Sequence, residues 1–153
     1  MEISTAIICK HFNELSTIEL YNIIKLRLAV FCVEQNCPYQ DADDKDQESW
    51  HLMVFDDKKR LIAYSRLIPK GLCYPEYASI GRVATSALVR KTGVGKLLME
   101  KSIEQIHILF GETPVMIGAQ SYLLKFYESF GFSSTGEEYL EDGIPHTRMV
   151  LKD

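Results

Sequence analysis

The sequence predicts a mixed α/β fold, with a central sheet of about seven strands and helices on both faces, in a single domain over residues 1–153. Two observations support this prediction. Segments with strand and helix periodicity follow one another in the order strand, helix, three strands, helix, strand, helix, two strands. In addition, the strand–helix–strand unit around residues 79–118 favours a right-handed parallel crossover, whereas the other strands can pair as antiparallel hairpins.

The first helix is marked by its N-terminal cap. Residues 2–10 are apolar and β-branched enough for an opening strand, and Ser16 and Glu19 then have the spacing of a capping box. The helix that follows carries an apolar stripe made of Leu20, Ile23, Ile24, Leu28 and Phe31. We expect it to end or bend near residues 32–36, because the proline at position 38 disfavours helix in the residue before it.

Strands are expected next at residues 50–55 and 61–68, joined by a polar turn, and then at residues 79–85. A second long helix is predicted to open near Gly93 and to end at Gly111.

The C-terminal elements are shorter. They are a buried strand at residues 115–117, an amphipathic helix at 122–130, and two strands near 132–140 and 146–151 that are joined across 141–145.

Charge and composition exclude several classes of protein. The net charge of −4 gives no broad attraction to nucleic acid or anionic lipid. No run of about 18 apolar residues is present, so we expect no membrane span, and residues 1–10 lack the basic start of a signal peptide. Four cysteines without a C-x-x-C pair indicate free thiols in a reducing cytoplasm and no metal site.

Residues 40–48 form an acidic, polar segment. It lacks the Gly at the sixth position and the Glu at the twelfth position of a calcium loop that would start at Asp41. We therefore expect a solvated loop, with a weak electrostatic funnel for an amine as the alternative.

The segment from Arg90 to Lys96 lies between the strand at 79–85 and the second long helix. The free N–H groups of a helix start carry partial positive charge, and glycine lets a large anion approach the backbone, so this segment predicts a phosphate-binding site. It is not a P-loop, because Arg90 and Leu97 stand where that motif needs Gly and Ser or Thr. Nor is it a dinucleotide fingerprint, because Leu98 replaces the third glycine.

The pattern Arg-x-x-Gly-x-Gly at Arg90–Gly95 resembles the acyl-CoA pyrophosphate loop of the GNAT N-acetyltransferases. Residues 126–132 are similar to the Phe-Tyr-x-x-x-Gly-Phe segment of that superfamily, and the order of elements matches its fold over essentially the whole chain. Residues 30–39, 50–52 and 141–146 resemble the ElaA-like branch.

The resemblance implies acetyl-CoA as co-substrate. Its arm is expected along the strand at residues 83–85, with the thioester oxygen at a backbone N–H near Val83 or Ala84 and the pyrophosphate at the loop. Gln120 follows the strand after which the family often places an Asn that contacts the cofactor. The expected cofactor residues are Val83, Ala84, Thr85, Arg90, Lys91, Thr92, Gly93, Val94, Gly95, Lys96 and Gln120.

Tyr127 is the expected general acid. From helical spacing alone it reads as an aromatic core residue beside Leu123 and Phe130, but the resemblance implies that it protonates the departing CoA thiolate. A phenol titrates near 10, so it is protonated at neutral pH.

Three residues are candidates for the base that takes a proton from the amine, directly or through water: Glu34, His51 and His146. Each has an alternative role. Glu34 can pair with Arg27, His51 can be a strand residue with satisfied hydrogen bonds, and His146 can be bonded to the backbone of a hairpin.

We therefore expect an acetyl-CoA-dependent N-acetyltransferase that acts on a primary amine of a small molecule or peptide, with a homodimer as a family-level expectation. One alternative is an acyl-CoA sensor without turnover, which needs neither acid nor base. Another is an enzyme like the acyl-homoserine-lactone synthases, which needs a basic patch for an acidic carrier protein, and none is evident in the sequence. Acceptor specificity is expected from the loops at 34–48, 71–76 and 141–146.

Overall fold

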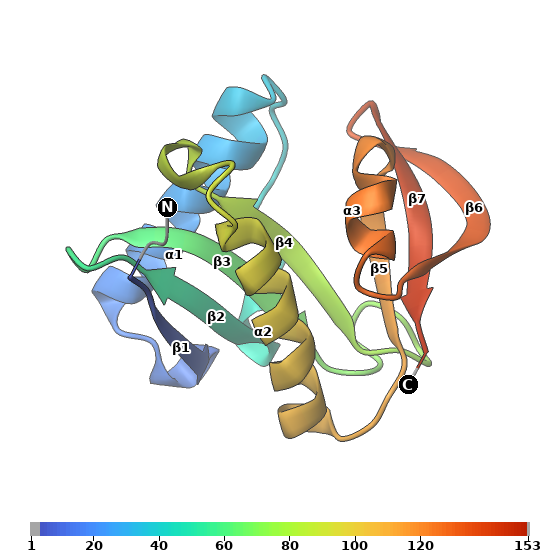
Figure 1. Ribbon diagram of the computed structural model, residues 1–153, viewed down its shortest axis with the longest axis horizontal. Helices are drawn as coiled ribbons and strands as arrows, with labels where there is room; N and C mark the ends of the chain where they lie inside the picture. Colours follow the sequence, from blue (N-terminus) through green and yellow to red (C-terminus); the bar gives the residue numbers. More distant parts are fainter. Residues whose placement is uncertain (1–3, 153) are drawn as a thin grey trace.

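The computed structural model of the protein describes residues 4–152 (Figure 1). The strands are β1 (Ala6–His11), β2 (Trp50–Phe55), β3 (Leu61–Ile68), β4 (Ser79–Thr85), β5 (Val115–Gln120), β6 (Ser133–Glu141) and β7 (Ile144–Leu151). The helices are α1 (Thr17–Leu28), which continues as a π-helical turn at Ala29–Glu34, α2 (Val94–Phe110) and α3 (Leu124–Glu128). This is the predicted order of elements, and the mixed α/β fold class is confirmed.

The strands form two antiparallel sheets. One has the order β1-β2-β3-β4, and the other has the order β5-β7-β6. They meet at one parallel bridge between Ala78 and Val115, where the Met116 N–H donates to the Ala78 carbonyl at 2.9 Å. Beyond that point β4 and β5 diverge, as Figure 1 shows. The parallel crossover that the sequence predicts is thus present, but it opens into a V.

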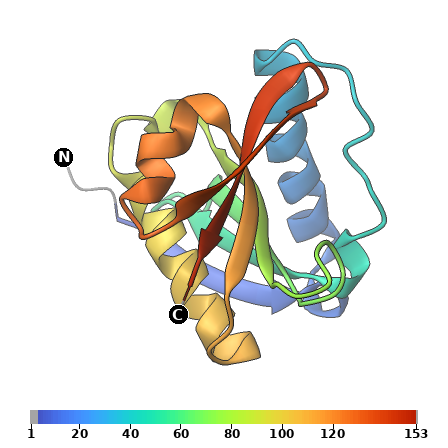
Figure 2. The same ribbon diagram turned by 90° about the vertical axis from the view of Figure 1, so that its right-hand side faces the viewer.

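The two long helices lie on opposite faces of the four-stranded sheet (Figures 1 and 2). Alternate residues of β2 divide between them: Leu52 belongs to the main core with Leu98 of α2, and Met53 packs with Ile23 of α1. The predicted capping box of α1 is present, because the Glu19 N–H donates to the Ser16 hydroxyl at 3.1 Å and the Ser16 N–H donates to the Glu19 carboxylate at 2.8 Å.

The strands at 50–55, 61–68 and 79–85 have the predicted bounds. The last helix is shorter than predicted: residues 121–123 form a 3-10 turn, and α3 covers only 124–128. Among residues 4–152, no helix has the length and apolar character needed to cross a membrane.

Candidate active site

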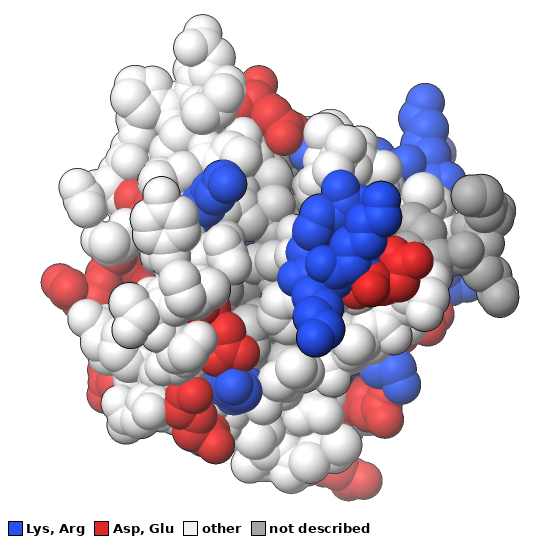
Figure 3. Space-filling view, turned by 90° about the vertical axis from the view of Figure 1, so that its left-hand side faces the viewer, with Lys and Arg blue, Asp and Glu red and all other residues white. Residues whose placement is uncertain are grey.

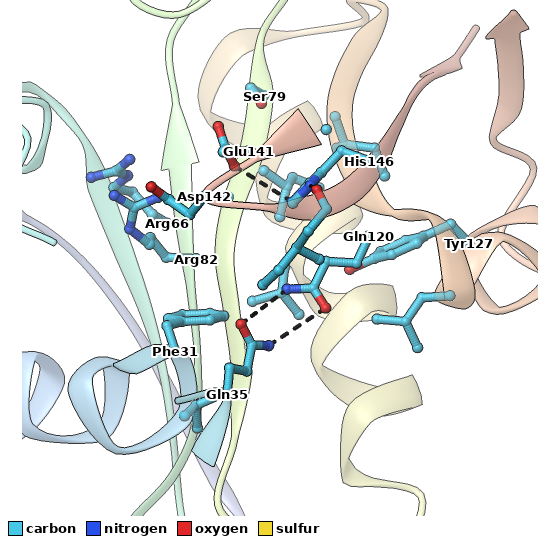
Figure 4. Close-up of a pocket in the computed structure, with 18 of the residues that line it drawn as sticks. Phe31, Gln35, Arg66, Ser79, Arg82, Gln120, Tyr127, Glu141, Asp142 and His146 are labelled. Atoms are coloured by element: carbon cyan, nitrogen blue, oxygen red, sulfur yellow. Dashed lines mark hydrogen bonds and ion pairs between the residues drawn. The ribbon is translucent and has the colours of Figure 1, made fainter. Parts of the chain in front are cut away.

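A cavity of about 840 Å³ lies in the V between the two sheets. Its walls come from β4 and the end of the π-helical turn on one side, and from β5, α3 and the β6–β7 hairpin on the other. Figure 4 shows Tyr127, Gln120 and His146 on the second wall, across from β4. This volume is in the range of small-molecule sites.

Strand β4 carries a bulge at the cavity. Tyr64 of β3 faces Ala84 and Arg66 faces Gly81, so Ser65 alone opposes the two residues Arg82 and Val83. Gly81, Arg82 and Val83 all line the cavity, as do Ser79 and Ile80 before the bulge. Of the expected cofactor residues on this strand, Val83 and Thr85 line the cavity, whereas Ala84 is buried in the core.

The N-terminus of α2 opens onto the same cavity through Gly95. Its first hydrogen bond joins the Leu97 N–H to the Gly93 carbonyl, so the N–H groups of residues 94–96 have no partner within the helix. Gly93 has a φ of 90°, a left-handed conformation that suits glycine. The predicted loop is therefore a helix start whose donors are free for an anion.

The other residues of this loop are placed around the helix start rather than in the cavity lining. Thr92 donates its hydroxyl to the Val89 carbonyl, Val94 is buried, and Lys96 lies near Glu100 at 4.0 Å. Lys91 is exposed. These residues can therefore contact a cofactor through their backbone N–H groups, or through side chains that lie outside the cavity.

Arg90 and Glu34 form an ion pair of 2.5 Å at the cavity wall, and Arg90 also donates to the Thr85 carbonyl. The alternative pairing of Glu34 with Arg27 is wrong, because the Arg27 guanidinium is fully buried and contacts Asp41 and Asp46. The π-helical turn explains this arrangement, since it carries Glu34 beyond α1 to the N-terminal end of α2.

Tyr127 is 7% exposed and lines the cavity, so it is both a core residue and a site residue. Burial raises the pKa of Tyr127 to about 12. Within residues 4–152, the Tyr127 hydroxyl has no hydrogen-bond partner. The phenol is therefore protonated at neutral pH and available as a donor.

The two candidate histidines differ in position. His146 lines the cavity, and its Nδ1–H donates to the Ile144 carbonyl at 2.8 Å, so Nε2 is the ring nitrogen available for proton exchange. The Glu141 carboxylate lies 3.5 Å from that Nε2.

His51 is fully buried and does not line the cavity. Its Nε2–H donates to the Asp46 carbonyl at 2.9 Å, its Nδ1 accepts from the Tyr64 hydroxyl at 2.7 Å, and burial lowers its pKa. His51 is thus placed in the core as a hydrogen-bonded structural residue, the alternative considered for it, and not at a site where it can act as the base.

The expectation of a solvated acidic loop is also wrong. Asp41 and Asp46 are buried, and with Asp43 they alternate with three arginines in a closed circle, which we name the arginine–aspartate ring. Asp41 joins Arg27 to Arg82, Asp43 joins Arg82 to Arg66, and Asp46 joins Arg66 to Arg27, with N–O distances from 2.7 to 3.3 Å. The carboxylates are neutralised by these arginines, so they do not form the funnel for an amine that was the alternative.

Two contacts join the cavity walls across the V. Gln35 and Gln120 exchange side-chain hydrogen bonds of 3.4 and 3.5 Å (Figure 4), and the Cys37 thiol donates to the Asp142 carbonyl at 3.5 Å. Gln120, an expected cofactor residue, therefore lines the cavity but already has a partner from the other wall.

Sequence reasoning missed the aromatic end of the cavity. The Tyr139 hydroxyl lies so close to Gly118 of β5 that a Cβ there would be 2.1 Å away, so a larger residue at this position requires the Tyr139 ring to move. The Arg148 guanidinium lies between Tyr139 and Tyr74, at 4.7 and 5.0 Å from the ring centroids. The sequence predicts strands β5 and β6 but not their order in the sheet, in which β7 lies between them. Without that order, the contact of Tyr139 on β6 with Gly118 on β5 could not be predicted.

The family model for the acetyltransferase (GNAT) domain matches residues 23–152. The chain belongs to the GNAT acetyltransferase family. It is an acyltransferase of that type, and the cavity in the V brings part of the predicted residues together, among them Arg90, Gln120 and Tyr127. The relatives agree: the Escherichia coli protein ElaA is 44% identical over 142 residues, which are 92% of both chains, so the ElaA-like resemblance is confirmed.

A UPF0039 protein of Schizosaccharomyces pombe is 40% identical to this GNAT chain over 144 residues, which are 94% of both chains. Two crystal structures superpose with a TM-score of 0.90 at 40% identity and 97% coverage of this chain. They are an acyl-CoA N-acyltransferase from Pseudomonas aeruginosa, covered to 99%, and Escherichia coli ElaA, covered to 100%.

Proposed function

We propose that the protein transfers the acetyl group of acetyl-CoA directly to a primary amine of a small molecule or peptide. The observation that carries the proposal is that one cavity joins the free N–H groups at the start of α2, the bulge of β4 and the unpartnered Tyr127 hydroxyl. The four cysteines are free thiols, which fits the cytoplasmic setting that we propose.

Acetyl-CoA is held by backbone groups in this proposal. The pyrophosphate lies at the N–H groups of residues 94–96, with Arg90 adding charge. The acyl arm then follows β4, and the thioester carbonyl accepts a hydrogen bond from the backbone N–H of Val83 at the bulge.

The reaction breaks one C–S bond and forms one C–N bond. The amine nitrogen attacks the thioester carbon, the Val83 N–H stabilises the oxyanion, and the intermediate collapses with release of CoA thiolate. Tyr127 gives its proton to the thiolate, and His146 Nε2 takes the proton of the amine through water. A proton returned from His146 to the phenolate through water restores the starting state.

A first test is the binding of acetyl-CoA alone. At 100 times its Kd, acetyl-CoA is expected to stabilise the fold by about 2.7 kcal/mol and to raise Tm accordingly. Gly95→Glu is expected to abolish this rise, because Gly95 lines the cavity and a Cβ there meets only ordinary contacts, so the carboxylate takes the place of the anion without backbone strain.

The control is Ile108→Glu, which adds the same charge to α2 at a side chain that is 67% exposed. It is expected to keep the full rise in Tm. An unchanged acetyl-CoA affinity in folded Gly95→Glu, measured by calorimetry, means that the loop does not hold the cofactor. Release of free thiol in the presence of a panel of amines then tests turnover.

The ion pair of Arg90 with Glu34 leads to a second expected result. Both side chains are partly exposed, and the pyrophosphate competes with the Glu34 carboxylate for Arg90. Glu34→Gln is therefore expected to tighten acetyl-CoA binding by up to about fivefold, the worth of an exposed ion pair. Glu104→Gln, which removes the partner of Lys101 elsewhere on α2, is expected to have no effect. Weaker binding in Glu34→Gln means instead that Glu34 holds Arg90 in place for the phosphate.

The carrier-protein alternative is not favoured. Figure 3 shows a basic patch on the side of the molecule where the β2–β3 turn projects, and Lys58, Lys59 and Arg60 are exposed in that turn. Arg60 is paired with Asp56 at 2.8 Å, and no residue of the turn lines the cavity. The basic turn therefore does not border the cavity, and a carrier protein bound there would not be placed next to Tyr127 or Val83.

A further inference from the structure

Arg82 has an unusual backbone for a residue within a strand. Its φ is 49°, in the left-handed region, although it is not a glycine and lies in the middle of β4. Such a conformation is uncommon for residues with a Cβ and persists only where the surrounding structure imposes it.

The side chain of Arg82 is anchored to the loop that carries Asp41 and Asp43. Its Nε donates to Asp41 at 3.1 Å, and its Nη2 donates to the Asp41 carbonyl at 3.2 Å and to the Asp43 carboxylate at 3.3 Å. The Tyr39 ring lies 5.4 Å from the guanidinium carbon, and its hydroxyl donates to Asp41 at 2.9 Å. Asp41 and Asp43 are fixed in turn by Arg27 and Arg66.

The bulge has a consequence for the next residue. Arg82 and Val83 both line the cavity, and neither residue has a partner in the register with β3. In a regular antiparallel pair each of the two residues would face a residue of β3.

We propose that Arg82 is a positioning residue: anchored by Asp41 and Asp43, it keeps β4 bulged and so holds the Val83 backbone N–H at the cavity. The proposal rests on the proposed function, in which that N–H stabilises the oxyanion. Arg82 acts through the backbone of its neighbour and takes no part in bond making.

A different role for Arg82 is to contact the acceptor or the cofactor with its charge. The two roles separate in a comparison of Arg82→Gly with Arg82→Ala. Both variants lose the charge, but glycine adopts a positive φ at no steric cost and alanine does not. Both variants remove the same charge from the arginine–aspartate ring and leave Asp41 and Asp43 with Arg27 and Arg66, so the effect of that lost charge is common to both and cancels in their comparison.

The experiment measures kcat, KM and acetyl-CoA affinity for both variants. Arg82→Ala is expected to lower kcat by about 10²-fold, the effect of losing one oxyanion donor. Arg82→Gly is expected to stay within about threefold of wild type, because glycine adopts the positive φ of the bulge without strain and so does not need the anchor that a residue with a Cβ needs. Equal losses in the two variants overturn the proposal and favour the charge role.

Lys59 supplies the matched control. It has a φ of 61°, is exposed and lies outside the cavity lining, so Lys59→Ala and Lys59→Gly are expected to differ in Tm but not in kcat.

A second readout does not depend on turnover. In ¹⁵N-labelled protein, acetyl-CoA is expected to shift the Val83 amide resonance in wild type and Arg82→Gly but not in Arg82→Ala. If no amine is acetylated by wild type, the proposed function fails, and this resonance still decides the role of Arg82. The same shift in all three proteins overturns the positioning role.

Discussion

Replacing Tyr127 by Phe is expected to lower kcat by about 10²–10⁴ while acetyl-CoA affinity stays nearly unchanged. The phenyl ring keeps its packing against Phe126 and Phe132, and only the hydroxyl is lost. Because that hydroxyl acts on the thiolate, which forms only as the C–S bond breaks, the loss falls on kcat rather than on KM.

The pH dependence of the wild-type enzyme is part of the same expectation. Burial raises the pKa of Tyr127 to about 12, so the acid remains protonated throughout the working range. Any loss of kcat between pH 7 and pH 10 must then come from another group.

Tyr21→Phe serves as the control, since Tyr21 is 68% exposed and lies on α1 away from the cavity. Steady-state rates of free thiol release measure both variants. A wild-type kcat in Tyr127→Phe removes Tyr127 from the mechanism and leaves it as a core residue.

The second large effect concerns stability. Asp46→Asn is expected to lower the free energy of unfolding by about 3–5 kcal/mol, the cost of removing one partner from buried ion pairs. Asp46 accepts from Arg27 at 2.7 Å and from Arg66 at 2.9 Å, and both arginines are almost fully buried. Urea denaturation measures the loss.

Glu48→Gln removes the same charge from an exposed residue of the same turn and is expected to change stability by less than about 0.5 kcal/mol. A loss below about 1 kcal/mol in Asp46→Asn, as for a surface ion pair, contradicts this view of the ring.

Acid has a related effect. Burial raises the pKa of Asp46, but hydrogen bonds from Arg27 and Arg66 outweigh it, so the net pKa is lowered. The stabilisation that the Asp46 carboxylate provides is therefore complete above pH values of about 3.9, the pKa of Asp in the unfolded chain. It is lost as the pH falls through the lower pKa of Asp46 in the folded protein.

Local signals in the sequence were enough for most of the fold. The capping box at Ser16, the periodicity of β2 and β3 and the glycines that flank α2 each act over a few residues, and each lies where it was predicted. The start of α2 as an anion site was predicted for the same reason, because its free donors follow from where the helix begins.

What the sequence did not reveal depends on contacts between distant segments. The acidic loop reads as a solvated segment because its arginine partners come from α1, β3 and β4. The bulge at Arg82 and the pair of Glu34 with Arg90 have no local signature either. Likewise, His51 and His146 are both strand residues, and only the packing shows that one lies in the core and the other at the cavity.

The arginine–aspartate ring also constrains how this sequence can diverge. With three cations and three anions in a closed circle, a change at one position leaves a charge without a counterpart, whereas loss of an adjacent arginine and aspartate together keeps the sum at zero. We therefore expect the six positions to vary together in related sequences. The least destabilising changes replace one arginine and one aspartate at the same time, although the two lie far apart in the chain.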